Sequence, residues 1–291
     1  MNKVPNVLFS VVFVLLFSST VFAEDFEYHP ALSDNFTVSL GVFKSDNAFT
    51  ISAEGNIEDS IDENIDFANS IGVDESSTLF DGQLRWKFGQ QSKWSLWGQY
   101  FSNDATGDIV LTEDIEWQDI TWREGTFVKG GVKLAVTRIF IGRSLVKNPQ
   151  HDFGIGIGIH NLDLSVFIEG EVMIDDMTSE FQRGDASISQ PLPNVGGWYN
   201  FSPARKWLLH AQLDWISAKI SKGIESISGI GDYNGTLWNT SVGVSYQAFR
   251  HVGFDLSYQY FDLNLKIDKT DWRGEVHMRY NGPVIGMTVN W

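Results

Sequence analysis

The sequence predicts an all-β protein: a single antiparallel up-and-down transmembrane β-barrel of about ten strands, placed after a cleaved signal peptide. Three observations predict it: alternating apolar and polar residues in many segments, alternating long and short connections, and an N-terminal export signal. The barrel is expected over residues 35–291, after a signal peptide over residues 1–23 and an N-terminal lead over residues 24–34.

Residues 282–291 show the alternation most clearly. Trp291, Val289 and Met287 are apolar, and small or polar residues separate them. Successive side chains of a strand point to opposite faces, so this segment has one apolar and one wettable face. A last strand with an apolar outer face and an aromatic at the membrane interface is typical of outer-membrane barrels. We interpret these three residues as the membrane-insertion signal through which the barrel-assembly machinery would bind the chain.

The N-terminus has the features of a secretory signal. Lys3 is its only charged residue, residues 7–17 are apolar, and small residues precede the expected cleavage after Ala23. No later stretch has the length of uncharged apolar sequence that a transmembrane helix requires. The sequence therefore predicts export to the outer membrane of a Gram-negative bacterium, with strands crossing the bilayer.

Composition excludes several classes of function. Removal of Lys3 with the signal peptide leaves 20 basic residues against 37 acidic ones, which argues against nucleic acid as a partner. The absence of cysteine excludes disulfides, thiolate chemistry and cysteine-bound zinc. We predict no cofactor, and we expect the partners to be outer-membrane lipids and lipopolysaccharide.

Loop lengths set the strand count. Short turns are expected at 89–91, 145–151, 203–205 and 250–251, and long loops include 58–75, 103–125, 171–190 and 221–233. Outer-membrane barrels have short periplasmic turns, long external loops and usually an even strand number, which gives ten here. Treating residues 44–47 and 281–283 as hairpin turns gives the alternative of twelve. The expected strands begin near Phe36, Phe80, Trp94, Val132, Phe153, Val195, Trp207, Trp238 and Val252, with a final long strand at the C-terminus.

Two positions interrupt the alternation. Arg138 lies on the otherwise apolar face of Val132, Leu134 and Val136, so we expect it near the membrane interface or at a change of register. The phase of the pattern reverses near His160, as a β-bulge would make it.

The polar faces of the strands are expected to line the lumen. Gly154, Gly156 and Gly158 alternate with isoleucine and would leave space inside a narrow barrel. A secreted β-sandwich also alternates, but Trp207 and Trp215 bracket apolar residues at the spacing that a tilted strand needs to cross hydrocarbon. The residues predicted to line the lumen are Arg85, Lys87, Gln212, Asp214, Asp255 and Gln259.

The sequence contains few candidates for chemistry. His210 and Asp214 share one face, with Ser217 or Ser241 nearby, and they form the arrangement to test for a nucleophilic mechanism. A luminal hydrogen-bond network explains the same residues, so no catalytic residue is predicted. Asp62, Glu63 and Asp66, or the pair at 175–176, could offer oxygen ligands to Ca²⁺ or Mg²⁺ and bridge to lipopolysaccharide phosphates. Their spacing matches no calcium loop, so no metal site is predicted either.

Several segments resemble known proteins. Residues 60–66, 71–74, 231–235, 258–261, 271–274 and 280–283 are similar to segments of a family of exported, largely uncharacterised Gram-negative outer-membrane proteins. The resemblance implies a single barrel in the outer membrane and supplies no catalytic residues. Three hypotheses stay open: a structural barrel or narrow porin-like channel for small solutes, an outer-membrane enzyme acting on lipid or peptide, and a surface adhesion barrel that binds through its acidic loops.

Overall fold

The computed structural model describes residues 28–55, 64–66, 76–112, 114–117, 120–175, 178–220, 232–268 and 272–291. The predicted signal peptide (1–23), most of the 58–75 loop and all but the last two residues of the 221–233 loop lie outside these residues. No helix in the described parts is long and apolar enough to span a membrane.

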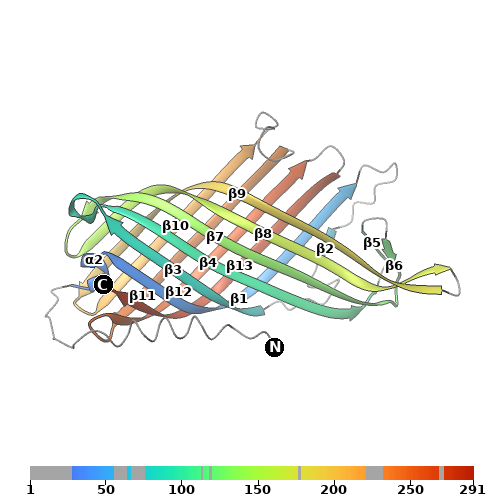
Figure 1. Cartoon of the computed structure of the whole chain (residues 1–291), viewed down its shortest axis with the longest axis horizontal. Helices are drawn as coiled ribbons and strands as arrows, with labels where there is room; N and C mark the ends of the chain where they lie inside the picture. Colours follow the sequence, from blue (N-terminus) through green and yellow to red (C-terminus); the bar gives the residue numbers. More distant parts are fainter. Residues whose placement is uncertain are drawn as a thin grey trace.

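Within the described residues, ten long antiparallel strands form a closed barrel (Figure 1). The first strand pairs with the last, from Thr37 opposite Asn290 to Gly55 opposite Trp272, so the sheet has no open edge between them. The twelve-strand alternative is wrong, because residues 44–47 and 281–283 lie inside continuous strands. The ten strands are β1 (Phe36–Gly55), β3 (Ser76–Phe88), β4 (Trp94–Val110), β7 (Phe127–Lys147), β8 (His151–Asp175), β9 (Thr178–Ala204), β10 (Trp207–Ile220), β11 (Asp232–Gln247), β12 (Val252–Asp268) and β13 (Trp272–Asn290).

The two ends of the barrel differ. Short turns gather at one end, together with the 3₁₀ turn η1 (Gln90–Ser92), the short helix α2 (Pro30–Ser33) and the C-terminus (Figure 1). Short turns are typical of the periplasmic end of such barrels. The opposite end carries β2 (Asn64–Asp66) beside β1 and a small hairpin of β5 (Ile115–Trp117) and β6 (Ile120–Trp122).

The expected loop at 171–190 is wrong. β8 and β9 continue through this region as a paired ribbon that reaches Asp175 opposite Thr178. Figure 1 shows this ribbon extending past the neighbouring strands.

The wall of the barrel changes character halfway along its length, and β12 shows how. Its outward residues run from Phe254, Leu256, Tyr258 and Tyr260, all exposed, to Asp262, Asn264 and Lys266. Its inward residues run in the opposite sense, from Gly253, Asp255, Ser257 and Gln259 to Phe261, Leu263 and Leu265. An apolar outer band marks the part of a barrel that meets lipid, and an apolar interior with a polar exterior is the pattern of a protein in water. We call the first part the membrane half and the second the outer half.

This inversion explains both interruptions in the sequence pattern. The bulge expected near His160 is wrong: β8 keeps its register there with both neighbours, and the even-numbered residues 160, 162 and 164 all point inward. The register also continues through Arg138, which is buried inside the barrel on the same face as Val136 and Phe140. The outer surface turns polar and the interior turns apolar because the strands leave the membrane, without any change in pairing.

The outer half is closed by a packed core. Phe101 meets Phe43 and Phe261 edge-on at ring-centroid distances of 6.5 and 5.6 Å, and Phe261 contacts Tyr280 at 6.2 Å. Trp122, from the β5–β6 hairpin, is completely buried within the same cluster. Other members are Leu134, Val136, Leu164, Ile168, Leu237, Leu263 and Met278.

Candidate functional site: the polar membrane half of the lumen

Glycines in the membrane half make room for large side chains. A Cβ atom on Gly154 would lie 2.2 Å from the Trp198 ring, and one on Gly142 would lie 2.5 Å from it. Gly158 gives the same space to Phe140 and Asn194. The interior space expected from these glycines is therefore filled by neighbouring side chains.

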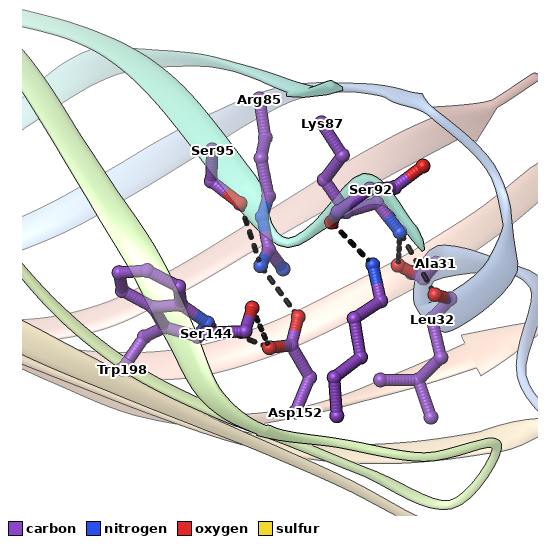
Figure 2. Close-up of polar contacts among 10 residues, drawn as sticks. Ala31, Leu32, Arg85, Lys87, Ser92, Ser95, Ser144, Asp152 and Trp198 are labelled. Atoms are coloured by element: carbon purple, nitrogen blue, oxygen red, sulfur yellow. Dashed lines mark hydrogen bonds and ion pairs between the residues drawn. The ribbon is translucent and has the colours of Figure 1, made fainter. Parts of the chain in front are cut away.

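A buried ion pair lies next to Trp198, near the end with the short turns (Figure 2). Arg85 Nη2 donates to Asp152 Oδ2 at 2.7 Å, and both side chains are almost inaccessible to solvent. Asp152 Oδ1 accepts from Ser144 Oγ at 2.6 Å and from Trp198 Nε1 at 3.2 Å. The guanidinium of Arg85 also stacks 4.3 Å from the centre of the Trp97 ring. These bonds offset the cost of burying both charges.

The segment before the first strand enters the lumen at the end that carries the short turns. Lys87 Nζ donates to the carbonyls of Ala31 and Leu32 at 2.8 and 3.0 Å, at the end of α2 (Figure 2). The His29 amide donates to Ser202 Oγ at 3.0 Å. Ala31 and Leu32 are buried against Leu208. We call residues 29–33 the plug.

A second ion pair crosses the lumen at the level where the interior turns apolar. Arg138 Nη2 donates to Asp214 Oδ1 at 2.8 Å, and its Nε lies 2.7 Å from Asp214 Oδ2. His160 and Asn239, both buried, complete this layer. Gln259 Nε2 donates to Asn239 Oδ1 at 3.3 Å.

His210 and Asp214 contact different partners. His210 Nε2 lies 2.7 Å from Asp255 Oδ2, and Ser245 Oγ donates to the same oxygen. Of the two nucleophiles considered with His210, Ser217 is exposed on the outer face of β10, and Ser241 lies in the wall of the cavity that His210 also lines. A nucleophilic serine needs a hydrogen bond to its histidine base, whereas Ser245 and His210 both bind the Asp255 carboxylate. The arrangement stabilises a buried charge.

The six residues expected to line the lumen all lie on inward faces. Arg85, Lys87, Asp214 and Gln259 are buried, and Gln212 and Asp255 border a cavity. The predicted set of lumen-lining residues did not include Asp81, Arg138, Asp152 and His29, which also face the interior. Asp81 follows the same alternation along β3 as Arg85 and Lys87, so the sequence places it on their polar face.

No group of three histidine or acidic side chains in the described residues is placed to hold a metal ion. Asp62 and Glu63 lie outside these residues, and Asp66 belongs to the short strand β2. Val289 and Met287 lie on the outward face of β13, and Trp291, directly after this strand, is 48% exposed.

A cavity of about 100 Å³ lies between the plug and the Arg138–Asp214 layer. Its walls include His29 of the plug, Arg85, Trp97, His210, Asp255 and Thr288. His29 precedes the first strand. Its pKa is lowered to about 4, chiefly by burial and to a smaller extent by the nearby His210, so the ring is neutral at pH 7.

Comparison with solved structures agrees with this architecture. The outer-membrane protease OmpT from Escherichia coli is similar over 92% of this chain and 99% of its own, with 10% sequence identity and a TM-score of 0.53. The chain folds as an outer-membrane β-barrel. At this identity the likeness to OmpT establishes the fold alone.

Two further structures have lower scores. The transport unit of the autotransporter AIDA-I from Escherichia coli covers 100% of both chains at 10% identity, with a TM-score of 0.39. The toluene transporter TodX from P. putida covers 94% of this chain and 96% of its own at 9% identity, with a TM-score of 0.32. No protein-family model and no curated protein matches the chain.

Proposed function

We propose that the protein is a closed, non-enzymatic outer-membrane barrel that holds an extended β-structure above the membrane and passes no solute. The observation that carries the proposal is the apolar core of the outer half, in which Phe43, Phe101, Leu134, Phe261 and Tyr280 are each no more than 1% exposed. A conducting channel needs a continuous polar path, and this core occupies the lumen across its width. The plug adds a second barrier at the periplasmic mouth.

Planar bilayers test the proposal. The purified protein should produce no stepwise conductance, and deletion of the plug should leave it non-conducting, because the core of the outer half stays in place. Stepwise currents from the intact protein would refute the proposal. Currents that arise only after plug deletion would assign the seal to the plug instead of the core.

The enzyme alternative is less well supported, because Ser245 and His210 both bind Asp255. The Asp255→Asn and His210→Gln variants are expected to leave the lipid A and phospholipid profiles of expressing cells unchanged. A changed lipid A or phospholipid profile in either variant would support the enzyme hypothesis.

The adhesion alternative has one structural support at the far tip of the barrel. Val110 and Phe127 are paired neighbours on β4 and β7, are 52% and 60% exposed, and point outward. Phe181, opposite Glu171 in the β8–β9 ribbon, is 64% exposed. Exposed apolar groups above a membrane are suited to contact with another surface. Autoaggregation of expressing cells should fall in a Phe127→Ser/Phe181→Ser variant, and an unchanged rate would count against adhesion through this tip.

A further inference from the structure

The end of the barrel with the short turns is basic, although the chain as a whole is acidic (Figure 1). The turn segments 89–93, 143–151, 203–206 and 248–251, together with the segment 28–35, contain six lysines and arginines against one acidic residue, Asp34, whereas the whole chain has 21 against 37. Three more acidic residues precede residue 28, outside the described residues, and the basic residues still outnumber the acidic ones by six to four. We call the six basic residues the basic rim: Lys93, Arg143, Lys147, Arg205, Lys206 and Arg250.

Arg143 lies at the edge of the lipid-facing band. It continues the outward row of Ile139 and Ile141 on β7, which are both exposed, and Trp94 lies opposite it on β4. The guanidinium carbon is 5.8 Å from the centre of the Trp94 ring. Two residues along a strand span about 7 Å, so the charge of Arg143 lies one such step beyond the last exposed isoleucine of the row.

Lys206 has a similar setting in the turn between β9 and β10. Its Nζ lies 5.8 Å from the centre of the Tyr246 ring, and the residue that follows it, Trp207, is exposed. Lys93 directly precedes the exposed Trp94. Tryptophan and tyrosine rings at the ends of membrane strands mark the level of the lipid headgroups. The cations of the basic rim are therefore at the level of the headgroup phosphates.

The exposed cations of the outer half have a different setting, because they face carboxylates across the sheet. The pairs are Arg183 with Glu169, Lys129 with Asp108, and Lys133 with Asp104. In the parts of the chain that the structure describes, Lys93, Arg143 and Lys206 form no ion pair with a carboxylate. The positive charge of the basic rim is thus left for a partner outside the chain.

We propose that the basic rim binds the phosphates of anionic phospholipid headgroups, of the phosphatidylglycerol type. Lysine and arginine donate charge-assisted hydrogen bonds to phosphate oxygens. Short turns are typical of the periplasmic end of such barrels, and the periplasmic leaflet of an outer membrane consists of phospholipid, so phospholipid is favoured over lipopolysaccharide as the source of the phosphate. The proposal is independent of whether the barrel conducts.

A triple variant removes the three rim cations that have no ion pair: Lys93→Gln/Arg143→Gln/Lys206→Gln. The matched control is Lys129→Gln/Lys133→Gln/Arg183→Gln, which removes the same number of charges from exposed positions of the outer half. Both variants keep the apolar outer band and the core, so both are expected to fold. The heat-dependent shift in gel mobility that folded barrels show checks this.

The test is electron spin resonance of lipids with a nitroxide on the acyl chain, in phosphatidylcholine vesicles that contain the purified protein. The spectrum of lipid next to the barrel gives the preference for labelled phosphatidylglycerol over labelled phosphatidylcholine. One cation near the surface favours an anionic lipid by about fivefold, so we expect a preference of up to that size in the unchanged protein. The preference should fall by at least half in the rim variant and stay the same in the control. It should also fall in about 1 M NaCl, where the screening length is about 3 Å.

Three results would overturn the proposal. The first is equal association of both lipids with the unchanged protein, and the second is a preference that the rim variant and the control lose to the same extent. The third concerns another anionic partner, the peptidoglycan: if isolated peptidoglycan retains the unchanged protein but not the rim variant, and no lipid preference exists, the rim binds cell wall instead of phospholipid.

Discussion

Replacement of Phe261 by alanine should lower the free energy of unfolding by about 3–5 kcal/mol. The Phe261 ring is fully buried and contacts Phe101 and Tyr280. A buried aromatic side chain removes roughly 150–250 Å² from water, worth about 4–6 kcal/mol at 25 cal/mol per Å², and alanine keeps only a part of that. Because ten hydrogen-bonded strands hold the wall in place, the space left by the ring should collapse little, which favours the upper part of the range.

Chemical denaturation of the protein refolded into lipid vesicles, followed by tryptophan fluorescence, measures the change. Phe254→Ala is the matched control, since Phe254 lies on the same strand, points outward and is 53% exposed to the lipid side. Lipid chains can fill the space that this control leaves, so its cost should be less than half as large. Equal losses for the two variants, or a loss below about 1 kcal/mol for Phe261→Ala, would show that the interior at Phe261 is not a packed core.

Two further predictions concern the membrane half. Arg138→Met leaves the Asp214 charge buried without its main partner and should cost about 3–5 kcal/mol, whereas the double variant Arg138→Met/Asp214→Leu should recover most of that loss. A double variant as unstable as the single one would refute this account of the pair. The plug should loosen on acidification. The pKa of His29 is about 4 in the docked plug and 6.5 for a free side chain, so the undocked state takes up the proton first. Docking therefore weakens as the pH falls from 6.5 towards 4. Lys87, His210 and Asp255 face the ring, and Asp34, whose pKa is raised by burial, opposes the effect. A nitroxide on Ser33→Cys should gain a mobile spectral component over this interval, and the trend should disappear with His29→Gln; a trend that persists in that variant would assign the effect to another group.

The alternation of residues was sufficient to predict the barrel, its ten strands and the inward face of the strands in the membrane half. The alternation could not show which face of a strand points into the barrel in the outer half. At Val132, Leu134 and Val136 the apolar residues face the core, whereas at Ile155, Ile157 and Ile159 they face outward. Apolar residues face outward where a barrel meets lipid and inward where it meets water. The alternation therefore reverses its phase near His160, and this reversal was interpreted as a bulge.

The β8–β9 ribbon was missed for a related reason. Much of residues 171–190 is polar or acidic, and an exposed ribbon is stabilised by backbone hydrogen bonds that leave little trace in the sequence. The partners of luminal side chains were also beyond sequence reasoning. Arg138 and Asp214 lie 76 positions apart, and strand tilt and stagger decide which inward residues meet across a barrel.

The level at which the strands leave the membrane can be measured directly on β12. A nitroxide is attached to a single introduced cysteine, since the chain has no cysteine of its own. Each label reports access to oxygen, which concentrates in lipid, and to a nickel chelate, which stays in water. The labelled positions are Phe254, Leu256, Tyr258, Tyr260, Asp262, Asn264 and Lys266. Oxygen access should dominate from 254 to 260 and chelate access from 262 to 266. Oxygen access that persists through 266, or chelate access at every position, would contradict a barrel that is half in the membrane and half above it.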